Sequence, residues 1–133
     1  MRSTAFTWAI RVAISATLAV SGVIHADLYI NGYRHIPTVG PAFLLQASVF
    51  CALAVLIVLG APDWFSWAAA VLSVGTLIAF ALSRTVGLFG FIERGLQPSP
   101  QAAISLITEV LTVALVTVFV WARRARAASP ATT

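Results

Sequence analysis

The stretch HADLYINGYRHIPTVGP, residues 25–41, gathers most of the chemically versatile side chains of a chain that is otherwise 60% hydrophobic. Imidazole, phenol and carboxyl groups exchange hydrogen bonds and protons, and imidazole and carboxylate also bind metals. The stretch contains His25, Asp27, Tyr29, Tyr33, Arg34 and His35. It is either a solvated connector or one wall of a binding site.

A second polar group follows between residues 84 and 101, and comprises Arg84, Glu93, Arg94, Gln97 and Gln101. Between its charged residues lies VGLFGFI, residues 86–92, which is too apolar for a free loop. We expect this stretch to be a short interfacial segment that caps the molecule. If both polar groups lie on one side of a membrane, they surround the opening of one cavity between the helices, here called the mouth.

Glu109 is the strongest single candidate for a functional residue, because it stands inside an apolar run of about 20 residues. At 1.5 Å per residue it lies about 12 Å below Gln101. A carboxylate at that depth costs several kcal/mol unless it is paired, hydrated or protonated, so it must face other helices. Ser105, Thr108 and Thr112 share its helical face, and Thr17, Ser21 and His25 form a matching stripe in the first run.

Two interpretations of Glu109 compete. In the structural one, it bonds to Ser or Thr hydroxyl groups, or pairs with Arg84, and fixes helix packing. In the functional one, it binds a cation, a proton or a polar ligand that enters from the mouth. The predicted binding residues are His25, Asp27, Tyr29, Tyr33, Arg34, Arg84, Glu93 and Glu109.

Other chemistries have weaker support. His25 could bind a metal together with Glu109, Glu93 or Asp27, but the spacing matches no fixed ligand motif. The single cysteine, Cys51, excludes an intramolecular disulfide. The sequence contains no GxSxG and no glycine-rich nucleotide motif. We therefore expect no cofactor and assign no catalytic residue.

The elements that must position these residues follow from composition. Only 9% of the residues are charged and the mean hydropathy is +0.98. Soluble domains carry about a quarter charged residues, so the surface must face lipid. The net charge of +4 without a basic stripe argues against nucleic acid as a partner.

Four apolar runs, at about 6–25, 42–60, 64–83 and 102–122, each match the ~20 residues that a helix needs to cross a bilayer. They predict an all-α, four-helix transmembrane bundle with antiparallel neighbours, forming one domain over residues 1–126. Asp63 is placed to cap the third helix. Residues 127–133 are expected to form a disordered tail.

Arginine counts predict the orientation. Five arginines, including Arg11 and Arg123, flank the terminal side of the spans, and three lie in the other links. The positive-inside rule then places both termini in the cytoplasm of a multi-pass plasma-membrane protein. Arg2, Arg11 and the run after them also have features of a secretory signal peptide, although the apolar run begins before Arg11.

The segments GVIHADLY (22–29) and GYRHIPTVGPAFLLQ (32–46) resemble a motif of small four-span membrane proteins of actinobacteria. In those proteins a histidine ends the first helix, and a GYR-x-IP segment leads into a second helix that begins with FLL(N/Q). Arg84, Glu93 and Glu109 fit the rest of the pattern. The resemblance covers about residues 18–110 and implies a four-helix bundle in the plasma membrane, with no established activity.

Three functions are compatible with the sequence. The first is a binding or accessory membrane subunit with an outward-facing polar cavity, alone, as a homo-oligomer or in a larger complex. The second is a small proton-coupled transporter that uses Glu109. The size and single embedded glutamate are similar to those of small multidrug resistance transporters, which carry that residue in the first helix. The third is a membrane enzyme or metal-binding protein at the outer mouth.

Overall fold

The computed structural model describes residues 2–128, and all regular structure in this range is helical. The elements are α1 (Arg2–Leu28), the π-helical turn η1 (Tyr29–Tyr33), α2 (Val39–Val58), α3 (Trp64–Arg84) and α4 (Gln101–Ala128). Residues 2–128 contain no β-strand. The predicted all-α fold is therefore confirmed. Of the expected tail, residues 127 and 128 end α4, and 129–133 lie outside the described residues.

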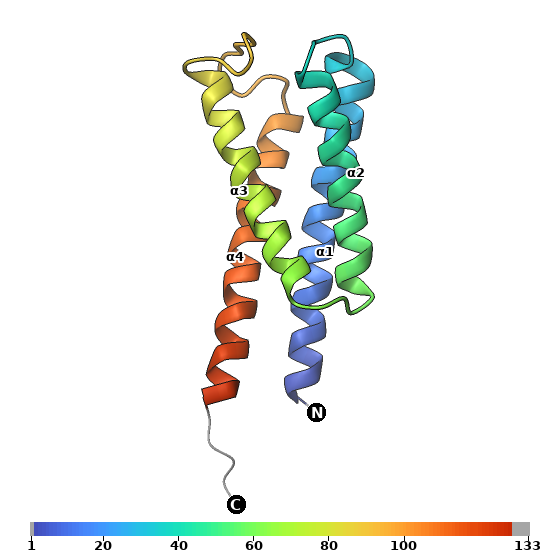
Figure 1. Ribbon diagram of the computed structural model, residues 1–133, viewed down its shortest axis with the longest axis vertical. Coiled ribbons are helices and arrows are strands. Elements are labelled where there is room, and N and C mark those ends of the chain that lie inside the picture. The colour runs from blue at the N-terminus through green and yellow to red at the C-terminus, as the bar shows by residue number, and fades with distance from the viewer. Residues whose placement is uncertain (1, 129–133) are drawn as a thin grey trace, which may run out of the picture.

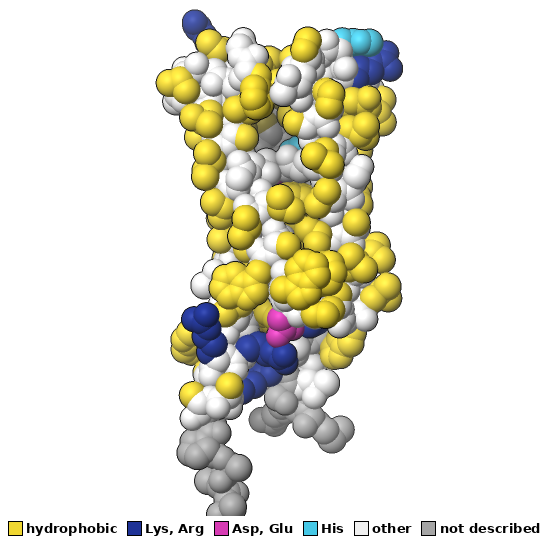
Figure 2. Space-filling view, in the orientation of Figure 1, with side chains coloured by type: hydrophobic (Ala, Val, Ile, Leu, Met, Phe, Trp, Pro, Cys, Tyr) yellow, Lys and Arg dark blue, Asp and Glu magenta, His cyan; other side chains and the backbone are white. Residues whose placement is uncertain are grey.

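In the described part of the chain, four helical segments are long and apolar enough to cross a membrane: Thr4–Tyr33, Val39–Val58, Trp64–Arg84 and Gln101–Ala128. Large hydrophobic side chains on their outer faces are exposed, including Leu45, Val71 and Val110, and apolar side chains cover much of the face shown in Figure 2. These features indicate a multi-pass membrane protein. With 27 and 28 residues, α1 and α4 exceed the predicted bounds, because hydropathy marks only the part within the hydrocarbon.

The two ends of the molecule differ in their connections (Figure 1). The N-terminus, the C-terminal end of α4 and the short connection 59–63 lie at one end, here called the termini end. The connections 29–38 and 85–100 lie at the opposite end, here called the link end. All four helices contribute to a hydrophobic cluster in the termini half: Ile10, Ile14, Leu18, Phe50, Leu53, Ala54, Ile57, Ala69, Val116 and Phe119.

Two glycines permit close packing around α2. A Cβ atom on Gly22 would lie 2.7 Å from Cys51 Sγ and 3.2 Å from the Ala47 carbonyl oxygen. A Cβ atom on Gly40 would lie 2.6 Å from the Tyr33 carbonyl oxygen. Any larger residue would therefore push α1, or the turn after η1, away from α2.

Asp63 does not act as the predicted side-chain cap of α3, since it makes no capping hydrogen bond within the described chain. Its carboxylate instead accepts from Arg11 Nη2 at 2.8 Å and from Arg123 Nε at 3.0 Å. Arg11 is buried and also donates to the carbonyl oxygens of Ile57 and Ala61. The two guanidinium groups bind different oxygens of Asp63, so charge pairing replaces the cap and ties α1, α4 and the 59–63 connection together.

Candidate functional site

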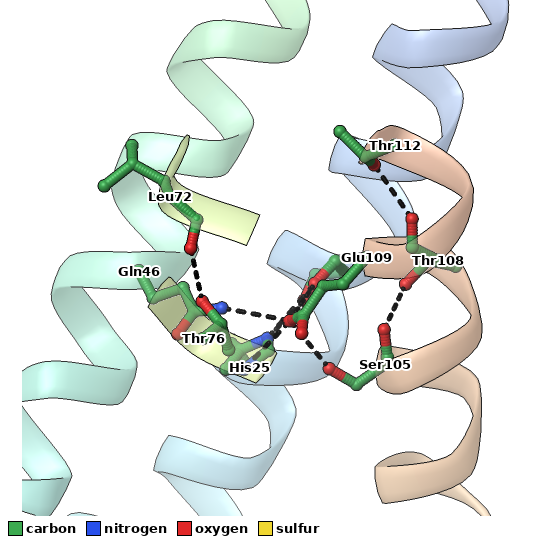
Figure 3. A network of polar contacts seen from close by, with 9 residues as sticks. His25, Gln46, Leu72, Thr76, Ser105, Thr108, Glu109 and Thr112 are labelled. Carbon is green, nitrogen blue, oxygen red and sulfur yellow. Dashed lines mark hydrogen bonds and ion pairs between the residues drawn. The ribbon is translucent and has the colours of Figure 1, made fainter. Parts of the chain in front are cut away.

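The Glu109 carboxyl group lies in the interior of the bundle and is 1% exposed. Its Oε1 atom accepts hydrogen bonds from three helices: from Ser21 Oγ of α1 at 3.2 Å, Gln46 Nε2 of α2 at 3.2 Å and Ser105 Oγ of α4 at 3.1 Å. Figure 3 shows Gln46 and Ser105 directed toward this group. Its other oxygen, Oε2, is buried and has no hydrogen-bond partner among residues 2–128.

His25 faces the same carboxyl group. Its Nδ1 atom lies 2.8 Å from the Ser21 carbonyl oxygen, which can only accept, so Nδ1 carries the hydrogen. In the neutral ring, Nε2 is then an acceptor, and it lies 3.9 Å from Glu109 Oε1. Two hydrogen-bond acceptors, His25 Nε2 and Glu109 Oε1, therefore face each other. A proton on one of them, or a donor group placed between them, would give them a hydrogen bond.

Ser21 lies beside both His25 and Glu109, yet this trio lacks the bonding of a catalytic triad. Ser21 Oγ donates to Glu109, and the imidazole nitrogen nearest to it, at 3.4 Å, already donates to a carbonyl oxygen. A catalytic base needs a nitrogen lone pair directed at the nucleophile. The arrangement therefore favours binding over nucleophilic catalysis.

The polar stripes of α1 and α4 meet on the side of Glu109 that faces the termini end. Thr17 Oγ1 and Thr112 Oγ1 are 2.8 Å apart, and Thr108 and Thr112 also bond to carbonyl oxygens of their own helix. In α3, the Thr76 hydroxyl group donates to the Leu72 carbonyl oxygen of the same helix (Figure 3). The carboxyl group is thus held mainly by α1, α2 and α4.

A cavity of about 120 Å³ extends from Glu109 toward the link end. One ordered water needs a cavity of roughly 10–15 Å³, so this cavity can hold a group larger than a water molecule. Its floor carries His25, Gln46, Ser105 and Glu109, and its link end carries Tyr33, Arg84 and Glu93. Between them the lining is largely apolar, with Phe43, Phe80 and Leu106 as its larger side chains.

A polar network covers the link end of this cavity. Tyr33 Oη donates to Glu93 Oε1 at 2.6 Å, and Arg84 Nη1 donates to Glu93 Oε2 at 2.6 Å. Arg84 Nη2 also donates to the Gln97 carbonyl oxygen at 2.5 Å. The Tyr33 ring stacks on Phe43 at 4.6 Å and meets Phe91 edge-on at 5.7 Å. This network closes the 85–97 segment over the cavity.

The structure brings five of the eight predicted binding residues to the cavity: His25, Tyr33, Arg84, Glu93 and Glu109. Asp27 lies two residues past His25, about 200° around the helix, and accepts from exposed Asn31. Tyr29 is half-buried, and exposed Arg34 bonds to His35. Within the described residues these three stay outside the lining. Arg84 pairs with Glu93, not with Glu109, because both face the link end.

The sequence did not predict that Gln46 would bond to Glu109 or that Arg11 would pair with Asp63. The available signal was polarity: Gln46 is an amide within an apolar run, and Arg11 is a charge within the first span. Residues 2–128 bring no group of three or more His, Cys, Asp and Glu side chains together.

The fold and the site define a class: residues 2–128 form an all-helical structure with four membrane-length helices and a carboxyl group buried between them. Comparison with family models, with curated proteins and with solved structures finds no match to this chain. The functional argument therefore depends on the geometry of the site.

Proposed function

We propose that this multi-pass membrane protein binds a small amphipathic molecule between its helices. The observation that carries the proposal is Glu109 Oε2, a buried oxygen on the cavity floor that lacks a partner within residues 2–128. A buried polar atom without a hydrogen bond costs roughly 1–3 kcal/mol. A ligand group that donates to this oxygen would remove that cost.

The acceptors on the floor select the polar head of the ligand. Glu109 Oε2 and His25 Nε2 both suit a donor, such as a hydroxyl or ammonium group, and disfavour a carboxylate. At the link end, the N–H of Arg84 Nε is also buried without a partner in the described chain. It suits an acceptor such as a carbonyl oxygen. The ligand would thus have a donor head, an apolar body and an acceptor toward the link end.

The route of entry is proposed to lie between α2 and α3. Ala42, Phe43 and Gln46 of α2 line the cavity opposite Thr76, Ala79 and Phe80 of α3. Figure 2 shows the surface hollowed between these helices in the half nearer the link end. A molecule dissolved in the bilayer could enter sideways there, without crossing the 85–97 segment.

The packed hydrophobic cluster of the termini half supports binding over transport. Phe50, Phe119 and Ile14 are almost fully buried there, between Glu109 and the termini end. A proton-coupled transporter that uses Glu109 is the second candidate. It would need this cluster to open toward the termini end in alternation with the cavity on the link side. A transporter predicts solute uptake into proteoliposomes driven by a pH gradient, whereas a binding protein predicts retention without uptake.

The proposed setting is a bacterial plasma membrane with antiparallel neighbouring helices and both termini in the cytoplasm. Arg11, Arg123 and Arg126 at the termini end support this orientation. Exposed Val86, Phe89 and Ile92 support an interfacial position for residues 86–92. Thr38→Cys in a Cys51→Ala background should react with an impermeant maleimide in intact cells, and Ala61→Cys should not. The reverse pattern would overturn the orientation.

A role as an accessory subunit, in a homo-oligomer or a larger membrane complex, is compatible with this binding function. It predicts that a second copy or a membrane partner co-purifies with the protein after mild solubilisation. A ligand-binding protein that acts alone would run as a monomer in nanodiscs.

The test compares octylamine, octanol and octanoate, which differ only in their polar heads. Each is added to the protein in nanodiscs, and retained ligand is measured by native mass spectrometry. We expect saturable retention of octylamine or octanol, and at least tenfold less octanoate. Equal retention of all three would overturn the proposal.

Variants separate the two kinds of donor head. Glu109→Leu removes both oxygens and should abolish retention of either ligand. Glu109→Gln keeps an acceptor but removes the carboxylate, so it should weaken the binding of octylamine far more than the binding of octanol. Thr117→Val, at an exposed position on the same helix, is the matched control and should retain ligand normally. Normal retention by Glu109→Leu would exclude this site.

A further inference from the structure

A second site lies at the termini end, far from the Glu109 cavity. A cleft of about 290 Å³ opens between the first turns of α1 and the last turns of α4, beside the 59–63 connection. Its lining is mainly polar and cationic: Thr4, Thr7, Trp8, Arg11, Gly60, Arg123 and Arg126. We propose that this cleft binds a phosphate group, supplied by the headgroup of an anionic phospholipid.

The charge of the cleft favours an anion. Arg11, Arg123 and Arg126 bring three guanidinium groups to it, and Asp63 is the acidic side chain that pairs with two of them. Figure 2 shows this concentration of basic side chains around an acidic group at the termini end. Among the described side chains of the cleft, three guanidinium groups stand beside one carboxylate, and this predominance of positive charge favours a phosphate group.

The arginines of the cleft are held in place by other contacts. Arg11 is fixed by Asp63 and by two carbonyl oxygens, so its guanidinium position is set by the fold. Arg123 donates to Asp63 and lies 5.9 Å from the Phe119 ring. Arg126 lies 5.4 Å from the Phe6 ring and donates to Thr7 Oγ1 at 3.0 Å. Held side chains lose less entropy when they bind a ligand, and guanidinium groups match phosphate geometry.

The depth of the cleft suits a lipid headgroup. All four tryptophans, Trp8, Trp64, Trp67 and Trp121, lie in the half of their helices nearer the termini end, and each is exposed by more than two-fifths. Tryptophan gathers where hydrocarbon meets headgroups, so the arginines just beyond this level reach the phosphate layer. A soluble phosphate compound carries the same group, and the experiment separates the two sources.

The test uses the full chain in nanodiscs of phosphatidylcholine with a minor fraction of phosphatidylglycerol. After extraction into detergent, retained phosphatidylglycerol is counted by native mass spectrometry. We expect at least one anionic lipid on the wild-type protein, and about fivefold less on Arg126→Gln, the size expected for one arginine at a charged surface. Arg126→Lys should lose less, because it keeps the charge but not the fork.

Arg124→Gln is the matched control, because it removes the same charge from the same helix. Arg124 lines the hollow between α3 and α4 instead of the cleft. If it reduces retention as much as Arg126→Gln does, the attraction is a general property of this end and the site is overturned. Equal retention in all variants would overturn it too.

A second arm adds glycerol 3-phosphate to the lipid-depleted protein and measures thermal unfolding. Stabilisation that is lost in Arg126→Gln but kept in Arg124→Gln, without selective retention of phosphatidylglycerol, would assign the cleft to a soluble phosphate and overturn the lipid source. Selective lipid retention without stabilisation by glycerol 3-phosphate supports the headgroup.

Discussion

Gln46 Nε2 of α2 donates to Glu109 Oε1 of α4 at 3.2 Å, and so joins two helices that are separated in the chain by the whole of α3. The same oxygen accepts from Ser21 of α1. Three helices therefore converge on one atom in the apolar interior, while the second oxygen of the same group faces a different environment. The first oxygen therefore contributes to helix packing, and the second is the one on which the proposed binding function depends.

Replacing Glu109 with leucine should lower the free energy of unfolding by about 1–2 kcal/mol, because the donors of Ser21, Gln46 and Ser105 lose their shared acceptor. Glu109→Gln should cost less, since its amide oxygen can still accept. Unfolding by SDS titration in mixed micelles measures both variants. A leucine variant as stable as the wild type would exclude the structural role.

Breaking the network at the link end should loosen the segment that covers the cavity. Glu93→Gln removes the ion pair with Arg84, whereas Tyr33→Phe removes one hydrogen bond and keeps the stacking on Phe43. We expect faster amide hydrogen exchange in residues 85–97, more for Glu93→Gln than for Tyr33→Phe. Exposed Arg94→Gln is the control, and the idea fails if all three variants exchange alike.

Removing Arg11 should be among the most destabilising single changes at the termini end. Arg11→Gln leaves the carbonyl oxygens of Ile57 and Ala61 without their charged donor, and takes one cation from Asp63. Asp63 is partly exposed and keeps Arg123, so the expected cost comes mainly from the two carbonyl oxygens that lose their donor, and is about 1–3 kcal/mol. Thermal unfolding in detergent should show this loss, and Arg124→Gln should show little change.

The coupling between Arg11 and Asp63 can be measured separately. The double variant Arg11→Gln/Asp63→Asn should be less destabilised than the sum of the single variants, because both single changes remove the same Arg11–Asp63 contact, which can be lost only once. Strict additivity would mean that the 2.8 Å contact contributes nothing to stability.

Gly22→Ala should destabilise the packing of α1 on α2 by about 1–3 kcal/mol, because the new methyl group meets Cys51 Sγ at 2.7 Å. Cys51→Ala removes that sulfur and should partly rescue the variant. The rescue is incomplete, since the Ala47 carbonyl oxygen remains at 3.2 Å. Thermal unfolding of the two single variants and the double variant tests this, and the absence of rescue would contradict it.

The sequence by itself determined the class of protein and the number of helices. With 9% charged residues, the surface must face lipid, where the backbone cannot bond to water. Four long apolar runs can satisfy their own backbone hydrogen bonds there only as helices. Helical periodicity also placed Ser105, Thr108, Glu109 and Thr112 on one face, and the cost of a lipid-facing carboxylate required that face to be interior.

Only the tertiary structure decided which groups meet. Periodicity defines a face within one helix, but not the rotation and depth of its neighbours, so it could not predict that Glu109 meets Gln46 or that Arg84 pairs with Glu93. It also could not show that Asp63 would bind Arg11 and Arg123 instead of capping α3. These choices depend on contacts between segments that are distant in the chain, where small shifts of one helix exchange one polar partner for another.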